Sequence, residues 1–257
     1  MPSAIELASY ADDLLATAAT PDYPNALNGL QFENTSAVRR IATAVDFSTR
    51  TIQGALSVEA NLFIVHHGMF WPGLRPITGK VFEQIRLLVD HDVAVYSSHL
   101  PLDRHESLGN NVLLAKELGL TPNAGFAQHE NVYIGVAGVT NLETAALLNR
   151  AQEFANSHGG SARASLLSAN RRTKRWAICT GAGASAETLL EAARSGIDTL
   201  IVGEGAHWTA VTAEELGLVI IYAGHYATET LGVQALGRHL SDKFNIPWSF
   251  VPAPTGL

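Results

Sequence analysis

A run of apolar and β-branched residues that ends in two histidines and a glycine constrains the fold of this chain most. The run is Phe63-Ile64-Val65-His66-His67-Gly68. An apolar strand without polar alternation is typical of a strand buried on both faces, as in a parallel sheet covered by helices. In open sheets of that kind, ligands bind at the carboxyl ends of the strands. The run therefore predicts an α/β fold that delivers two imidazoles to its ligand-binding edge.

The two adjacent histidines have two interpretations. Neighbouring residues of a regular strand face opposite sides, so His66 and His67 can serve one point only where the chain turns. At such a turn each imidazole could reach a different metal ion, because neutral imidazole is the commonest metal ligand. The alternative is one buried, hydrogen-bonded histidine beside one exposed histidine. The pair alone does not separate these interpretations, and partners elsewhere in the chain must decide.

Strand and helix patterns alternate along the chain in two similar halves. In the first half, predicted strands alternate with predicted helices, and the segments are 41–45, 48–58, 63–67, 80–90, 93–98 and 107–118. The same order recurs in the second half, at 175–179, 185–196, 199–202, 209–216, 219–222 and 230–243. We therefore predict two similar three-layer α/β domains related by internal duplication. The first would comprise residues 1–124 plus 230–257, with a closing edge strand, and the second residues 125–229.

Composition excludes several classes of protein. The net charge of -7 argues against a nucleic-acid-binding surface, which needs clustered lysines and arginines. No apolar run approaches the roughly 20 residues that span a bilayer, and Ser3 to Glu6 form a capping box that indicates a folded first helix instead of a signal peptide. The single cysteine, Cys179, leaves no intrachain disulfide and suits a cytoplasmic location. Its apolar surroundings predict a buried, inert thiol.

Polar residues gather at four predicted strand ends. They form four pairs, namely His66 with His67, His99 with Asp103, Glu204 with His207, and His225 with Glu229. Imidazoles mixed with carboxylates, without thiolates, suit Zn, Mn, Fe, Ni or Co. A carboxylate can bridge two such ions about 3.5 to 4 Å apart, and the ion pair then activates a water. Each motif alone also occurs by chance or as a structural histidine, but four of them at equivalent sheet edges indicate a site.

Three segments at these edges carry a further signal. They are Ile64-Val65-His66-His67-Gly68, His99-Leu100-Pro101-Leu102-Asp103 with the following Leu108-Gly109-Asn110-Asn111, and Ala223-Gly224-His225-Tyr226-Ala227-Thr228-Glu229. They resemble, in order, the three signature motifs of the Nif-three-like family, whose members are often named GTP cyclohydrolase 1 type 2 homologues. The match extends from Asn28-Gly29-Leu30-Gln31 to the closing strand, so it covers nearly the whole chain.

The resemblance implies two similar α/β domains, a dinuclear metal centre between them and a ring-shaped hexamer. Two divalent transition-metal ions per chain would have four terminal ligands and one bridging carboxylate, Glu229; the terminal ligands would be His66, His67, Asp103 and His225. It also implies that His99 orients a ligand or moves a proton. Glu204 and His207 match the family pattern less closely. A large insert that some relatives carry between the domains is missing from this chain.

Two functions follow from this interpretation. The first is a metal-dependent hydrolase that acts on a nucleotide or a phosphate ester, with His99 or His207 as a proton carrier. The second is a non-catalytic, metal-holding or regulatory scaffold whose ring contacts another protein. Five protein ligands shared by two ions leave coordination positions for water or substrate, which favours the hydrolase.

One glycine-rich segment offers a competing interpretation. Thr180-Gly181-Ala182-Gly183-Ala184-Ser185-Ala186 follows a predicted strand and opens a helix, and Glu204 lies roughly 20 residues further on, as in a dinucleotide-binding fingerprint. A lone fingerprint is a weak signal, and a dinucleotide site would leave the histidines unexplained. We therefore expect these glycines to permit a close approach to an anion or to the neighbouring site.

Overall fold

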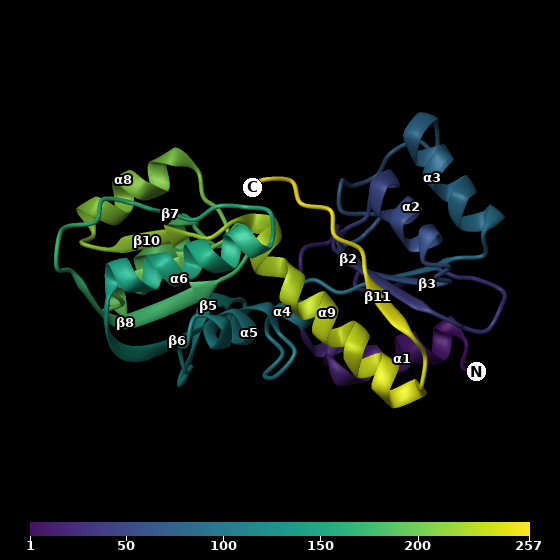
Figure 1. The fold of residues 1–257 in the computed structure, drawn as a ribbon, viewed down its shortest axis with the longest axis horizontal. Helices are drawn as coiled ribbons and strands as arrows, with labels where there is room; N and C mark the ends of the chain where they lie inside the picture. The colour runs from purple at the N-terminus through teal and green to yellow at the C-terminus, as the bar shows by residue number, and fades with distance from the viewer. The chain divides into compact units, whose positions relative to one another are not determined.

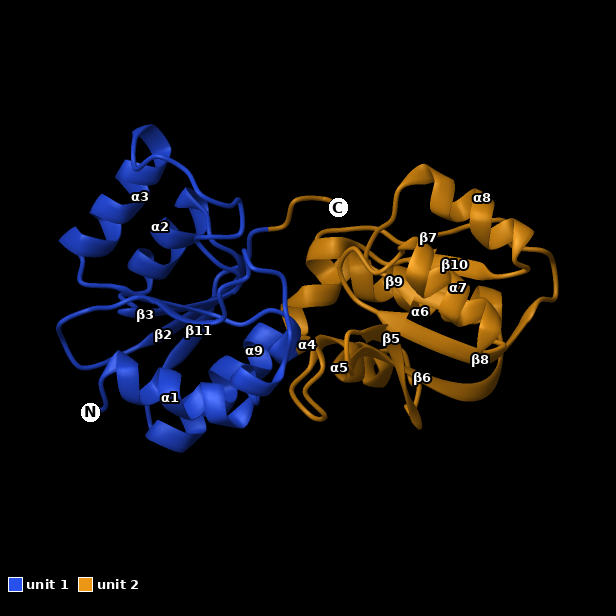
Figure 2. Ribbon diagram, turned by 180° about the vertical axis from the view of Figure 1, so that it is seen from behind, with its two compact units in different colours: residues 1–102, 232–253 blue, residues 103–231, 254–257 orange.

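The computed structural model describes residues 1–257, which form two compact α/β units (Figure 2). Unit 1 consists of residues 1–102 and 232–253, and unit 2 of residues 103–231 and 254–257. Each unit has its own sheet and its own hydrophobic core. None of the helices has the length and apolar character that crossing a membrane requires.

Unit 1 is built on a five-stranded sheet in the order β1-β4-β3-β2-β11. Its strands are β1 (Gly29–Phe32), β2 (Ile41–Asp46), β3 (Leu62–His67), β4 (Ala94–Ser97) and β11 (Trp248–Phe250), and its helices include α1 (Ala4–Leu14), the short 3-10 turn Thr17–Ala19, α2 (Thr49–Ser57) and α3 (Gly79–Asp90). All neighbours are parallel except β1, which runs antiparallel to β4. Two further helices, α4 (Leu100–Asp103) and α9 (His225–Phe244), cross the unit boundary along the chain.

Helices cover both faces of this sheet (Figure 1). Phe63 and Val65 of β3 point to one face and pack with Leu88 of α3, in a cluster that α2 also joins. On the other face, Tyr96 of β4 donates a hydrogen bond to Asp12 of α1 at 2.9 Å. The result is the expected three-layer arrangement, because successive strand residues serve opposite faces.

Unit 2 is built on a six-stranded sheet in the order β5-β6-β8-β9-β10-β7. Its strands are β5 (Ala124–His129), β6 (Val132–Glu143), β7 (Arg163–Ala164), β8 (Arg172–Cys179), β9 (Thr199–Val202) and β10 (Val219–Tyr222), and its helices are α5 (Asn110–Glu117), α6 (Thr144–Ser157), α7 (Ala186–Arg194) and α8 (His207–Glu215). Trp176 and Ile178 of β8 pack with α5 and α6. The alternate residues Ala177 and Cys179 pack with α7 and α8.

The two sheets share one topology, which confirms the prediction of two similar α/β domains. In unit 1 the parallel strands β2, β3 and β4 carry β1 as an antiparallel neighbour of β4. In unit 2 the parallel strands β8, β9 and β10 carry β7 as an antiparallel neighbour of β10. The helices between these strands correspond as well, α2 and α3 to α7 and α8. Beyond these shared strands, unit 1 adds β11 beside β2, and unit 2 adds β6 beside β8 with β5 at the edge.

Helix starts were predicted with mixed success. Ser3 caps α1 with the predicted capping box, and Ser48 and Ser185, at which two helical segments were predicted to begin, cap α2 and α7 with reciprocal capping boxes. The predicted helix start at Ser107 is wrong, because the backbone N–H groups of Ser107 and Leu108 donate to the ring of His105 and α5 begins only at Asn110. The last helix begins at His225, five residues before its predicted start at residue 230.

Residues 103–124 pack in unit 2, whereas the sequence predicts them in the first domain. Leu114 of α5 and Leu118, the residue that follows this helix, are fully buried in the cluster that contains Trp176, so the apolar face of α5 packs on the second sheet. The predicted domain boundaries stay a prediction.

Candidate metal centre

A histidine cluster stands at the carboxyl edge of the unit 1 sheet. His66 and His67 are the last residues of β3, and His99 follows β4. One potential ligand atom from each of the three lies within 4.8 Å of the others. All three are buried, with His66 at 0% exposure and His67 at 7%. The interpretation of one buried beside one exposed histidine is therefore wrong, and both neighbouring imidazoles offer nitrogen atoms to one point.

An oxygen atom orients each imidazole of the cluster through Nδ1. His66 Nδ1 lies 2.9 Å from the backbone oxygen of Ser98, and His67 Nδ1 lies 2.9 Å from Asp46 Oδ1. Because a carbonyl oxygen can only accept, His66 donates its Nδ1–H and holds its lone pair on Nε2 when neutral. Metal-binding histidines in proteins are oriented in this way by carboxylates and backbone carbonyls.

The third histidine, His99, is held by a buried carboxylate. Its Nδ1 lies 2.8 Å from Asp22 Oδ1, and Asp22 Oδ2 also accepts hydrogen bonds from the Asn28 side chain and from the backbone N–H of Leu100. Burial raises the pKa of Asp22, but the hydrogen bonds and charge of His99 and the other two donors outweigh it, so that this pKa lies below its usual value. Asp22 therefore stays ionised and fixes the ring of His99.

Trp71 covers the cluster. Its ring centroid lies 4.7 Å from that of His67 and 4.6 Å from that of His99. A large apolar ring against two imidazoles limits the access of water to them and restrains their rotation. Neither Trp71 nor Asp22 was among the predicted site residues, because no motif at their positions distinguishes them from other loop residues.

The second cluster lies in unit 2 at the start of α9. His225 and Glu229 are four residues apart on this helix and therefore lie on one face of it. His225 Nε2 is 3.1 Å from Glu229 Oε2, and His225 Nδ1 is 2.8 Å from Glu204 Oε1. Burial lowers the pKa of His225, but the hydrogen bonds and charges of Glu229 and Glu204 prevail and raise this pKa to about 9. Glu204 thus orients His225 as Asp46 orients His67.

Asp103 borders the same region of unit 2. Its Oδ1 accepts a hydrogen bond from Asn110 Nδ2 at 2.8 Å and a longer one from Thr180 Oγ1 at 3.4 Å. Asn111 donates to the backbone oxygen of Asp103 and accepts from the backbone N–H of Thr180. The two asparagines of the Leu108 to Asn111 motif therefore fix Asp103 beside the Thr180-Gly181 turn.

Gly181 leaves room for Glu229. It has a φ of +62°, and a Cβ atom at this position would lie 2.1 Å from Glu229 Oε1 and 3.4 Å from His225 Nε2. The glycine-rich segment that resembles a dinucleotide fingerprint thus leaves the space that the Glu229 carboxylate occupies. This close approach is of the kind expected from the sequence.

Replacement of Gly181 by alanine should therefore damage the site. We expect Gly181→Ala to displace the Glu229 carboxylate and to lower metal content, measured by elemental analysis of purified protein. Gly217→Ala is the matched control, because Gly217 has a φ of +69° and nothing lies within 4 Å of its added Cβ. Both variants incur the backbone strain of roughly 1–2 kcal/mol, so equal metal contents would contradict the steric role of Gly181.

The donor atoms suit a transition metal ion. The buried groups offer imidazole nitrogens in unit 1 and carboxylate oxygens with one imidazole in unit 2, and neither cluster contains a thiolate. Such a mixture fits divalent first-row ions. Cys179 takes no part: burial, and then the negative charges of Asp103, Glu191 and Glu229, raise its thiol pKa to about 12. His207 belongs to neither cluster and is exposed at the start of α8.

Comparison with known proteins decides the family. A family profile described as Duf34/NIF3 (NGG1p interacting factor 3) matches residues 3–254. The chain belongs to the Duf34/NIF3 family. Two relatives, both named GTP cyclohydrolase 1 type 2 homolog, are each 38% identical to it. The Deinococcus radiodurans relative aligns over 98% of this chain and 94% of its own, and the Pyrococcus abyssi relative over 98% of both.

Solved structures show the same fold for this Duf34/NIF3 member. The structure of protein ybgI, described as of unknown function, has a TM-score of 0.88 and 32% identity, and covers 99% of this chain and 100% of its own. The protein TTHA1606 from Thermus thermophilus has a TM-score of 0.82 at the same identity and coverage. The predicted family resemblance and fold class are therefore confirmed.

Proposed function

We propose that this Duf34/NIF3 protein is a metal-dependent hydrolase with a dinuclear centre that acts on a nucleotide or a phosphate ester. The observation that supports it most is the histidine cluster, in which three buried imidazoles are oriented through Nδ1 and offer ligand atoms within 4.8 Å of one another. Imidazoles oriented in this way are typical of metal-binding histidines. The name of the relatives, GTP cyclohydrolase 1 type 2 homolog, supports the substrate class.

In this proposal the protein would hold two ions of Zn, Mn, Fe, Ni or Co. Glu229 would be the carboxylate shared by the ions, and the other ligands would be His66, His67, Asp103 and His225. When bound, such ions supply Lewis acidity to the substrate and lower the pKa of water. Imidazole ligands are neutral, so the negative charge that balances the ions would come from the carboxylates of Asp103 and Glu229.

His99 has the features of a proton carrier. Asp22 holds its Nδ1–H, which leaves Nε2 as the atom that exchanges a proton with a reacting group. A base that is itself oriented by a buried carboxylate is a recurring catalytic arrangement. Trp71 packs against this ring and limits the access of bulk water, so that proton exchange with solvent competes less with exchange with the reacting group. His207 stays a prediction as a second carrier.

The substrate class is tested on metal-loaded protein with a panel of nucleotides and phosphate esters. We expect turnover of at least one member of the panel, abolished by chelation and restored by one of the five metals. No turnover on the whole panel, with metal content intact, would overturn the hydrolase proposal and favour the metal-holding scaffold.

Metal uptake should depend on pH through His225. Below a pKa of about 9 this imidazole is protonated in the metal-free protein, and a metal ion binds only the neutral ring. We therefore expect affinity for Zn²⁺ to rise with pH up to about 9, and Zn²⁺ binding near pH 7.5 to release a proton from His225. Calorimetry in buffers of different ionisation enthalpy measures this release, and Glu204→Gln should shift the rise to lower pH.

The same raised pKa predicts how the stability of the metal-free protein changes with pH. Because the pKa of His225 rises from 6.5 to about 9 on folding, its ion pairs contribute fully below about pH 6.5 and are lost as the pH rises through 9. Unfolding in urea at pH 6 and pH 9.5 compares the two states. An unchanged difference in Glu204→Gln would contradict this assignment.

We also propose a cytoplasmic homo-oligomer. The family resemblance supports a ring-shaped hexamer, and the single buried cysteine, Cys179, suits a reducing compartment. Native mass spectrometry measures the assembly directly against the chain mass of 27.4 kDa. A mass that is not six times the chain mass would overturn the hexamer.

A further inference from the structure

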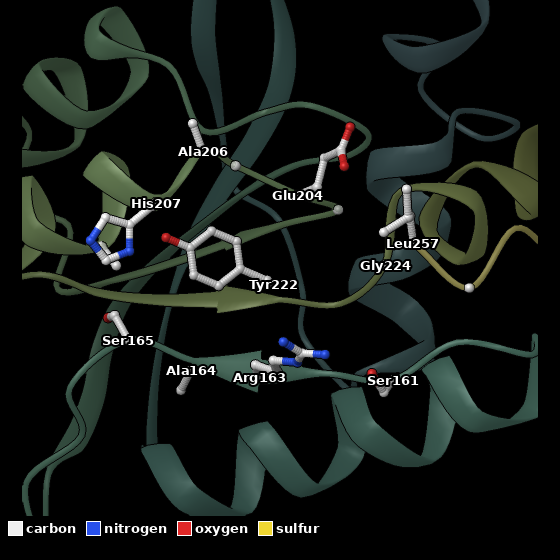
Figure 3. Close-up of a pocket in the computed structure, with 14 residues that line it drawn as sticks. Ser161, Arg163, Ala164, Ser165, Glu204, Ala206, His207, Tyr222, Gly224 and Leu257 are labelled. Atoms are coloured by element: carbon white, nitrogen blue, oxygen red, sulfur yellow. The ribbon is translucent and has the colours of Figure 1, made fainter.

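Unit 2 contains a cavity whose lining includes none of the proposed metal ligands. Its volume is about 430 Å³, and all of its lining residues belong to this unit. Ser161 and Arg163 form one wall and Tyr222 of β10 another, while Glu204 and His207 come from the loop after β9 and the start of α8 (Figure 3). A concave site of this volume is in the range that binds small molecules.

Arg163 is the only lysine or arginine in the lining. It is exposed, and no hydrogen bond or ion pair joins its side chain to another residue of the structure. Arg163 pairs with Tyr222 across the antiparallel strands β7 and β10, so both side chains lie on the same face of the sheet. The Tyr222 hydroxyl is already bonded to Thr209 Oγ1 at 2.8 Å. The guanidinium therefore presents its donors to the cavity beside an aromatic ring.

One residue of the cavity wall contacts a proposed metal ligand. Glu204 lines the cavity, and its Oε1 lies 2.8 Å from Nδ1 of His225. A molecule whose anionic group is held at Arg163 can thus direct its other end to the residues that hold His225. The only arginine side chain and the only glutamate side chain of the lining stand at different walls, so a bound anion has a preferred orientation.

We propose that this cavity is the substrate-anchoring site and that Arg163 binds the phosphate group of a phosphorylated small molecule. This inference rests on the proposed function, because it assigns an anchor to the same hydrolase. A phosphate offers three accepting oxygens, enough for two parallel guanidinium N–H donors and the hydroxyl of Ser161. Ser161 is exposed on the same wall, two residues from Arg163.

The test measures ligand binding to the metal-free full-length chain, so that phosphate cannot bind a metal ion. The probes are guanosine monophosphate, ribose 5-phosphate, neutral guanosine and citrate. Calorimetry at low ionic strength measures their binding. We expect both phosphates to bind, guanosine and citrate to bind much more weakly, and added salt to weaken phosphate binding. Absence of phosphate binding, or equal binding of guanosine or citrate, would overturn the assignment.

Variants of Arg163 identify the anchor. We expect Arg163→Ala to weaken guanosine monophosphate binding by about tenfold or more, and Arg163→Lys to have an intermediate effect because lysine lacks the planar fork. Arg194→Ala is the matched control, since Arg194 is an exposed arginine at the end of α7. Thermal unfolding of each variant establishes that it is folded. Equal affinities of wild type and Arg163→Ala would overturn the proposal.

Failure of this inference is distinguishable from failure of the hydrolase. Phosphate binding that depends on Arg163 in a protein without turnover would leave the cavity site standing. Turnover without Arg163-dependent binding would reject the cavity alone. Metal content should be the same in Arg163→Ala as in wild type, because Arg163 touches no proposed ligand.

Discussion

His67→Ala protein, purified without chelator or affinity metal, should retain less than half of the metal found in the wild-type chain. We expect the wild type to carry about two first-row transition ions per chain, as a dinuclear centre requires. His67 is 7% exposed, its Nδ1 is fixed by Asp46, and it offers a ligand atom within 4.8 Å of those of His66 and His99. Its removal deletes one oriented nitrogen donor from the unit 1 cluster.

Elemental analysis by plasma mass spectrometry measures this loss. The matched control is His91→Ala, because His91 is an exposed histidine of the same unit at the end of α3. His91→Ala should keep the wild-type metal content. Asp46→Asn should give an intermediate content, since a lost supporting carboxylate typically lowers metal affinity 10- to 100-fold. Wild-type metal content in His67→Ala would reject His67 as a ligand.

Glu229→Gln should lower the turnover rate of any substrate that the panel identifies by at least about 100-fold. The change preserves the shape of the side chain but removes the charge that a bridging ligand needs, and loss of a supporting outer group alone can cost that much. Glu229 is 3% exposed and its Oε2 lies 3.1 Å from His225 Nε2. Water therefore has little access to take the place of the lost carboxylate oxygen. Steady-state kinetics with saturating metal measures the effect.

A second measurement on Glu229→Gln does not depend on activity. In the metal-free variant the pKa of His225 should fall from about 9 toward its ordinary value, because Glu229 is one of the two carboxylates that raise it. Ring-proton chemical shifts followed by NMR report this pKa. Glu214→Gln, at an exposed position of α8, should change neither turnover nor the His225 titration. An unshifted His225 pKa in Glu229→Gln would mean that the ion pair is unimportant.

The strand-end histidines could be predicted because the residues next to them in the sequence determine their position. His66 and His67 follow an apolar run whose length and composition fix it as a buried strand, and the end of such a strand is a known ligand edge. The serine caps were also local, since a serine and the residue three positions later satisfy each other. In these cases the residues that determine the structure are neighbours in sequence.

The partners of the site residues could not be predicted in the same way. Asp46 meets His67 because β2 and β3 pair in a register that sets these two residues side by side, and no local pattern specifies that register. Asp22 reaches His99 across 77 positions of sequence. The membership of α5 in unit 2 likewise depends on which sheet its leucines contact. Helical periodicity predicts an apolar face but not the sheet on which this face packs.

The duplicated topology has a chemical consequence. Copying a sheet would give two identical edges, yet the proposed ligands of unit 1 are imidazoles and those of unit 2 are two carboxylates and one imidazole. Borderline ions such as zinc or nickel are selected by imidazole, and harder ions such as manganese by carboxylate. In the proposed dinuclear centre, two ions held by such unlike donors would not be interchangeable, so a mixed-metal pair would be as natural an occupant as a matched one.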